Sequence, residues 1–164
     1  MKMERETFIN AMRCVASSVT VVTTNGSAGR YGATVSAFCS VSADPPTVLV
    51  CLNSKSRIAK GVIENKKFNI NVLSQNANKI AQRFAGVNDS ELLDRFEGID
   101  LQKAEIPAIN GATVFSCEVD QVIPSGTHQV VIGKVDFVET VREQPLTYFD
   151  GSYHQVTPLT LEVV

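Results

Sequence analysis

Two serines follow an extended apolar run at a point where a helix is expected to begin. The segment LNSKSR, residues 52–57, places Ser54 and Ser56 beside Lys55 and Arg57. Free backbone N–H groups at a helix start attract anions, and hydroxyl and cationic side chains complete a phosphate site. One of the serines could equally be an ordinary helix N-cap with solvated cations beside it. The segment lacks the glycine-rich loop that binds nucleoside triphosphates.

Small hydroxyl side chains follow the preceding strand-like segment, YGATVSAFCSVSADPPTVLVCLN, residues 31–53. Thr34, Ser36, Ser40 and Ser42 stand where a buried strand would carry larger apolar side chains. Such residues let a flat ligand approach the backbone, and they can hydrogen-bond to a polar ring edge or a sugar chain. The alternative is a tightly packed barrel corner into which only small side chains fit.

Two later segments carry the histidines and most of the tyrosines. His128 follows a Pro-Ser-Gly turn at the mouth of an expected strand, where its imidazole could form one hydrogen bond or change charge near neutral pH. It could also simply cap the turn or face solvent. The segment YFDGSYHQV, residues 148–156, holds aromatic side chains that either stack on a ligand ring or close the core. The spacing indicates no Ser-His-Asp or Cys-His pairing.

Composition narrows the class of protein. The chain of 164 residues is 44% apolar and 20% charged, which predicts one globular domain spanning residues 1–164. A net charge of −2 gives no basic field for nucleic acid or anionic membranes. No apolar run approaches the roughly 18 to 20 residues that span a bilayer. Because the first twenty residues also lack a signal-peptide pattern, we expect a cytoplasmic protein.

The cysteines do not form a metal-binding pattern. They are few and irregularly spaced, and no C-x-x-C pair is present, so neither zinc nor any other metal is expected. Each lies in an apolar neighbourhood and is predicted to be a small core side chain rather than a disulfide partner. The cysteines are Cys14, Cys39, Cys51 and Cys117.

The elements that must position these residues follow from periodicity and turn signals. Helices are predicted over 4–16 (with Phe8, Ala11, Met12 and Val15 on one face), from Ser54 or Ser56 to 65, over 76–86 and over 89–96. Strands are predicted over 19–24, 31–42, 47–53, 68–73, 113–123, 128–140 and 146–150. The strand 47–53 is apolar on both faces and should be central, whereas 68–73 alternates and should be half-buried. Short helices between many strands favour a closed or nearly closed antiparallel barrel.

Taken in order, these segments resemble the short-chain flavin reductase family, whose members supply reduced flavin to two-component monooxygenases. The similarity covers nearly the whole chain. It includes the Phe8-x-x-Ala11-Met12 helix, VTVVTT, GATVSAFCSVSADPPTVLVCLN, FNINVL, RFAG, GTH and YFDGSY. The arrangement CSV-x-x-x-PP-x-x-LVCLN and the GTH triplet are most similar to reductase components such as that of 4-hydroxyphenylacetate 3-monooxygenase.

The resemblance implies a mainly β fold, namely an FMN-binding split β-barrel: a Greek-key antiparallel barrel with peripheral helices. It also implies a homodimer that binds FMN or FAD, oxidises NADH or NADPH, and feeds a separate oxygenase component. By position, Thr34, Val35 and Ser36 would line the isoalloxazine. Cys39, Ser40, Val41 and Ser42 would follow the dimethylbenzene edge and ribityl chain, and Asn53, Ser54, Lys55 and Ser56 would hold the phosphate. Phe84, Ala85 and Gly86 would flank the flavin, while His128 and Tyr153 would lie on the nicotinamide side.

Two positions depart from the family pattern. Relatives usually carry Ala where Val35 stands, and many carry an acidic residue where Thr127 stands. The first change could shift the ring slightly, and the second leaves His128 without an adjacent carboxylate.

The chemistry implied by the family requires few protein groups, because the flavin performs the difficult step. We therefore assign no catalytic acid or base, and we expect His128 to position the nicotinamide. A flavin-binding protein of the same fold that does not turn over is the main alternative. An oxidase of the pyridoxamine-phosphate type is a further one, although the sequence shows no extra basic cluster for its substrate.

Overall fold

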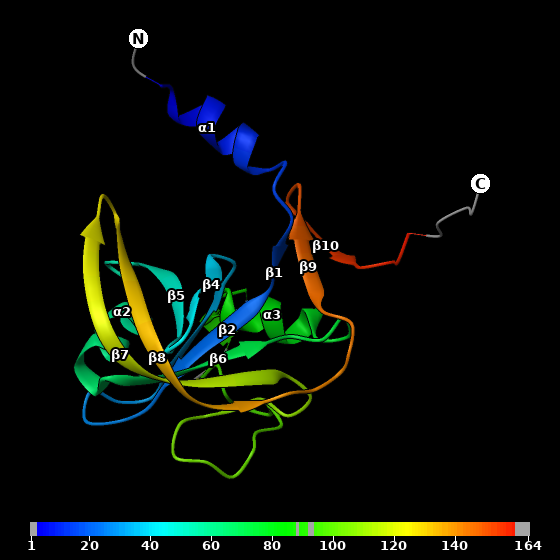
Figure 1. The fold of residues 1–164 in the computed structure, drawn as a ribbon. Coiled ribbons are helices and arrows are strands. Elements are labelled where there is room, and N and C mark those ends of the chain that lie inside the picture. Colours follow the sequence, from blue (N-terminus) through cyan, green and yellow to red (C-terminus); the bar gives the residue numbers. More distant parts are fainter. Residues whose placement is uncertain (1–2, 88, 92–93, 160–164) are drawn as a thin grey trace.

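The computed structural model describes residues 3–87, 89–91 and 94–159, which fold into ten strands and three α-helices (Figure 1). The helices are α1 (Arg5–Met12), α2 (Arg57–Asn65) and α3 (Asn78–Phe84), with a 3-10 turn at Asp89–Glu91. The strands are β1 (Ser17–Ser18), β2 (Thr20–Thr24), β3 (Tyr31–Val35), β4 (Phe38–Ala43), β5 (Pro46–Asn53), β6 (Lys67–Val72), β7 (Thr113–Ser125), β8 (His128–Glu139), β9 (Leu146–Phe149) and β10 (Ser152–Gln155).

Seven strands form one antiparallel sheet in the order β3-β2-β6-β7-β8-β5-β4. The two edge strands, β3 and β4, are consecutive in the chain and are joined by only two residues. At that joint the Cys51 N–H of β5 donates to the Ala37 carbonyl at 3.0 Å, and β3 itself contacts β5, so the sheet curls until its edges lie together. The expected antiparallel barrel is therefore confirmed.

The barrel interior is filled by branched and aromatic side chains. Val22, Val50, Phe68, Ile70 and Val131 are fully buried there. The apolar face of α2 belongs to the same core, because period-3.6 spacing puts its buried residues on one side of the helix.

A second core lies outside the barrel, where α3 packs on the outer surface of β2. Its fully buried members include Val21, Leu73, Ala81 and Phe84. A small three-stranded sheet, β1-β9-β10, closes this core through Leu146. Two layers of apolar packing therefore share the strands of one sheet, and α3 is fixed at the sheet's β3 edge.

Strand β6 differs from the half-buried strand that its alternation predicts. Both of its faces are covered: Asn69 is 3% exposed and Asn71 is fully buried. The Asn71 side chain donates to the Val21 carbonyl at 2.8 Å and accepts from the Ile109 N–H at 2.8 Å. The asparagines face the irregular segment before β7. Their buried amides are stable there because they form hydrogen bonds with backbone polar groups of that segment.

Other elements differ from the predictions in extent. The helix predicted over 4–16 is the shorter α1, which projects away from the barrel in Figure 1 with its residues exposed, so among the described residues no element packs on its apolar face. The strand predicted over 31–42 is divided into β3 and β4 at the barrel corner. The helix predicted over 89–96 is only a 3-10 turn where it is described; residues 92 and 93 lie outside the described residues.

The cysteine prediction is correct for one position and wrong for two. Cys117 is buried in the barrel core, whereas Cys14 and Cys39 are exposed and Cys51 is half-buried. Cys14 follows the projecting helix and Cys39 lies on edge strand β4, so no element of the described residues covers either thiol. All are free thiols.

Candidate active site

A cleft of about 750 Å³ opens between strand β3, the start of α2 and the described part of segment 89–96. Backbone and small side chains of β3 form one wall, and the first residues of α2 form another. The lining residues used below are Ala33, Ser56, Arg57, Asp89, Arg95 and Phe96. The structure therefore brings together the two segments that the sequence singles out separately, the small-residue strand and the serine-rich helix start.

The start of α2 is a capped helix N-terminus. The Ser56 hydroxyl accepts from the Ala59 N–H at 3.2 Å and donates to the Asn53 carbonyl at 2.6 Å. The Asn53 side chain accepts from the Lys55 N–H at 2.9 Å. Of the two readings that the sequence left open, helix capping is thus correct for the hydroxyl of Ser56, while the positive end of the helix still faces the cleft.

The Ser54 side chain is free for another partner. Its hydroxyl has no hydrogen bond to the protein among the described residues, although its backbone N–H donates to the Thr127 carbonyl at 3.0 Å. Ser54 is half-buried at the C-terminal end of β5, beside the exposed Lys55. A hydroxyl and an ammonium group next to a helix start form a donor set that suits a phosphate ester.

Three arginines and two aspartates make the cleft strongly polar. Arg30 forms an ion pair with Asp94 and lies 4.7 Å above the Phe96 ring. Arg95 pairs with Asp89, and the hydrogen bond from Arg95 is the largest cause that holds the pKa of Asp89 below its ordinary value. Arg57 adds a further lowering through its charge. With two of the guanidinium groups paired, Arg57 is the cation of this set left for a ligand.

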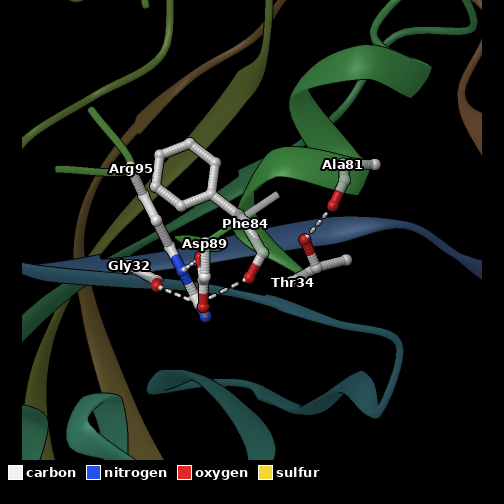
Figure 2. Close-up of polar contacts among 6 residues, drawn as sticks. All are labelled: Gly32, Thr34, Ala81, Phe84, Asp89 and Arg95. Carbon is white, nitrogen blue, oxygen red and sulfur yellow. Dashed lines mark hydrogen bonds and ion pairs between the residues drawn. The ribbon is translucent and has the colours of Figure 1, made fainter. Parts of the chain in front are cut away.

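Helix α3 is attached to the β3 edge by polar contacts, which Figure 2 shows. The Thr34 hydroxyl donates to the Ala81 carbonyl at 2.6 Å. Arg95 donates to the Phe84 carbonyl at 2.8 Å and to the Gly32 carbonyl at 3.3 Å. The Thr34 hydroxyl proton is therefore committed to α3, which leaves only its oxygen lone pairs and methyl group for a ligand.

The RFAG segment ends α3 and forms a turn at the same edge. The Phe84 ring is fully buried and contacts Phe96 edge-on at 5.0 Å between ring centroids, so only the backbone of Phe84 can flank a ligand. Ala85 is exposed, and Gly86 has a φ of 92°, which favours glycine. The predicted flavin contact thus falls on the turn rather than on the aromatic ring.

The remaining residues predicted to contact the flavin ring and ribityl chain lie along the corner of the barrel between β3 and β4. Val35 is 9% exposed and packs inward, whereas Ser36, Cys39, Ser40 and Val41 are exposed on one continuous stretch. Small side chains here are not explained by burial, because most of them face outward.

Ser42, a predicted flavin contact, and Cys51 on the neighbouring strand β5 interact with other groups of the protein. The Ser42 hydroxyl is used within its own turn, since it donates to the Asp44 carbonyl and accepts the Asp44 N–H. Burial first, and the neighbouring Cys39 second, raise the pKa of the Cys51 thiol.

His128 and Tyr153 lie in different parts of the chain. His128 begins β8 opposite Asn53, and its Nδ1 lies 2.9 Å from the Thr127 hydroxyl. Tyr153 lies on β10 and packs edge-on against Tyr148, and burial raises its pKa. It lines a second cavity of about 460 Å³ that does not include His128. Within one chain, the structure does not bring these predicted nicotinamide residues into one pocket.

Several cleft residues escaped the sequence reasoning. Arg30, Asp89, Arg95 and Phe96 converge only because the segment after α3 folds back over β3. Asp89 and Arg95 lie in a stretch read as a short acidic helix, in which they would be solvated surface residues. Only the extra charge beside RFAG could have drawn attention to them.

Comparison with known proteins identifies the family. The model of the flavin reductase like domain matches residues 12–157, and the chain belongs to this family. The NADH-dependent FMN reductase RutF of Enterobacter cloacae is 38% identical over 157 residues, covering 92% of this chain and 93% of the relative. RutF of Escherichia coli K12 is 35% identical over 155 residues, with the same coverage.

Solved structures agree with this assignment. The flavin reductase of styrene monooxygenase from Pseudomonas putida S12 superposes with a TM-score of 0.81 at 29% identity, over 94% of this chain and 99% of the other. Component B of nitrilotriacetate monooxygenase from Mycobacterium thermoresistibile gives a TM-score of 0.84 at 29% identity, over 97% and 93%. The split-barrel fold and the family resemblance drawn from the sequence are both confirmed. Among the described helices, none has the length and apolar character needed to cross a bilayer.

Proposed function

We propose that this protein is an NAD(P)H:flavin oxidoreductase that reduces FMN or FAD and supplies the reduced flavin to a separate oxygenase component. The observation that carries the proposal is the cleft that strand β3 and the start of α2 line together, with the exposed small-residue corner following β3 directly along the chain. In this proposal the small-residue corner offers a surface for a flat ring, and the segment at the start of α2 offers a donor set for a phosphate. The named activities of the family relatives support the same reaction.

The chain's own residues have distinct tasks in this proposal. Ser54, Lys55 and the α2 start hold the phosphate, and Arg57 adds positive charge from the cleft. The exposed backbone and hydroxyls from Ser36 to Ser40 follow the ring edge and the sugar chain.

The hydride step requires positioning rather than a protein acid or base. A bound flavin accepts a hydride from the reduced nicotinamide, so the protein must hold two rings face to face and exclude other orientations. His128 is exposed beside the phosphate segment, where its ring can orient the nicotinamide. Thr127 can hold the imidazole in place through a hydrogen bond between its hydroxyl and Nδ1.

A homodimer is part of the proposal. One protomer leaves large apolar side chains exposed on α1 and on the β7–β8 hairpin, among them Phe8 at 58% and Phe137 at 61%. Exposed apolar groups of this size mark interaction surfaces. Association of two chains would also allow the Tyr153 region of one protomer to complete the His128 side of the other. Light scattering after size exclusion should give twice the monomer mass.

A cytoplasmic location also belongs to the proposal. The described residues include four free thiols, two of them exposed, which suits a reducing compartment.

The deciding experiment mixes purified protein, NADH or NADPH, and FMN or FAD, and follows absorbance at the reduced-nicotinamide band. Oxidation should depend on both flavin and enzyme and should produce reduced flavin under anaerobic conditions. Flavin binding without oxidation of either nicotinamide would refute the reductase and favour a non-catalytic flavin-binding protein.

A further inference from the structure

We propose that Arg95 is a positioning residue for flavin: it fixes the Phe84–Gly86 turn against strand β3 at the edge of the proposed flavin site, the cleft that Arg95 lines together with Gly32 and Asp89. This inference rests on the proposed function, because it concerns how tightly and in what geometry the flavin is held. Arg95 was not among the residues predicted from the sequence, and it acts through the turn rather than by touching the reacting atoms.

The guanidinium group of Arg95 joins three separate segments (Figure 2). One nitrogen, Nη1, donates to the Phe84 carbonyl at 2.8 Å and to the Gly32 carbonyl at 3.3 Å. The other two, Nε and Nη2, donate to the Asp89 carboxylate at 2.9 and 2.6 Å. The guanidinium group of Arg95 therefore links the end of α3, the strand β3 and the loop after α3 that carries Asp89.

The opposite side of the same helical turn is fixed as well. Thr34 on β3 donates to the Ala81 carbonyl at 2.6 Å, three residues before the carbonyl that Arg95 holds. The last turn of α3 is thus bound to β3 at two points, one from a strand side chain and one from Arg95. Removing Arg95 releases the end that leads into the turn and leaves the other end attached.

Close packing around the Phe84–Gly86 turn leaves its backbone little room to adopt another position. A Cβ atom on Gly32 would lie 2.5 Å from the buried Phe84 ring, so β3 and the ring are already in close contact. A Cβ atom on Gly86 would lie 2.9 Å from Nη2 of Arg95, so the guanidinium lies directly against this left-handed glycine. Arg95 therefore defines where the backbone of the turn can lie.

Arginine suits this task better than lysine. A guanidinium presents its N–H groups in a fixed plane, which allows a bidentate pair with a carboxylate and a further bond to a carbonyl at the same time. An ammonium group has no such fork and would keep the charge while losing the geometry. The Arg95 side chain is 32% exposed, so the hydrogen bonds of its guanidinium group, rather than deep burial, determine its position.

The test compares Arg95→Gln and Arg95→Lys with a matched control, Arg83→Gln. Arg83 also connects α3 to the loop, through the Glu97 carbonyl, but it does not contact the Phe84–Gly86 turn carbonyls or β3 in the described structure. Flavin dissociation constants are measured by fluorescence titration of the apoprotein, together with flavin KM, NADH KM, kcat and Tm. The visible circular dichroism of bound flavin reports the geometry of the ring in its site.

We expect Arg95→Gln to raise the flavin dissociation constant about tenfold or more, with a smaller rise for Arg95→Lys. The NADH KM at saturating flavin should stay within about twofold, and the visible circular dichroism of bound flavin should change. Arg83→Gln should lower Tm by a similar amount and leave flavin binding and the spectrum unchanged.

The proposal is overturned if Arg95→Gln binds flavin as the wild type does, or if Arg83→Gln loses as much affinity at an equal fall in Tm. The second outcome would mean that Arg95 contributes to general stability only. A wild type that binds flavin but oxidises no nicotinamide would refute the proposed function, and the binding comparison would still decide the role of Arg95.

Discussion

Ser54 and Ser56 are only two residues apart, yet the structure predicts that replacing them has different consequences. The Ser56 hydroxyl serves as the α2 N-cap and as a donor to the Asn53 carbonyl. The Ser54 hydroxyl has no protein partner among the described residues and lies in the segment proposed to hold the phosphate. Ser54→Ala should therefore affect flavin, and Ser56→Ala should affect the helix.

The magnitudes follow from the bonds involved. Loss of a serine N-cap costs about 1 kcal/mol, which lowers Tm by about 2–4 °C in a domain of this size. A hydrogen bond to a charged group contributes about 1.5–3 kcal/mol, which corresponds to roughly a 10- to 150-fold change in a dissociation constant. We expect Ser54→Ala to weaken flavin binding within that range and to change Tm without flavin by less than about 1 °C.

The assay combines thermal unfolding of the apoprotein with calorimetric titration of FMN into each single variant and into the double variant. Ser56→Ala should lower Tm and change flavin affinity by no more than about threefold, because its hydroxyl is already committed. If Ser54→Ala binds flavin normally, or if Ser56→Ala loses more affinity than Ser54→Ala, the assignment of Ser54 to the phosphate is refuted. The double variant should show the sum of the two effects, since they act on different equilibria.

Three further predictions address the core, a thiol and the nicotinamide side. Asn71→Ala leaves the Val21 carbonyl and the Ile109 N–H without their buried partner, so Tm should fall by at least about 4 °C, whereas an exposed control such as Asn10→Ala should leave it within about 2 °C. Burial raises the pKa of the Cys117 thiol from 9.0 to about 12, so it should resist alkylation in the native protein at pH 8, and labelling at a rate equal to that of the unfolded chain would contradict the buried site. Since the folded-state pKa is the higher one, this thiol's contribution to stability is complete below pH 9 and is lost as the pH rises toward 12. His128→Ala should raise the NADH KM more than the flavin dissociation constant, and equal losses of both would place the imidazole in the flavin site.

Much of the architecture follows from local signals. The β-branched run from Val19, the alternation in 68–73 and the turn residues between strands predict a barrel because they fix where the chain extends and where it reverses. The helix start at Ser56 and the glycine stop at Gly86 are likewise local, since each depends on its own backbone geometry. These signals located the strands and helices that carry the proposed site.

Burial was harder to predict, because it depends on what covers a surface. Asn71 reads as a solvent-facing residue by alternation, but a distant segment covers it and uses its amide as a hydrogen-bond partner. Cys39 reads as a core residue by its apolar neighbours, yet it lies on an edge strand. The helix over 4–16 is predicted to carry an apolar face, yet α1 has no buried residue, since no other element of the described residues covers that face.

The sequence by itself determined the strand-rich barrel, the family, and the two segments that bear hydroxyl groups, because these depend on residues close together in the chain. Only the tertiary structure decided that the Ser56 hydroxyl caps α2 while the Ser54 hydroxyl has no partner among the described residues, that the ring of Phe84 is buried, and that Arg95 joins β3 to the end of α3. Arg95 and Gly32 are 63 residues apart, and no local pattern encodes a contact at that separation. The physical reason is that a guanidinium acquires its partners only when folding brings their carbonyls within hydrogen-bond distance.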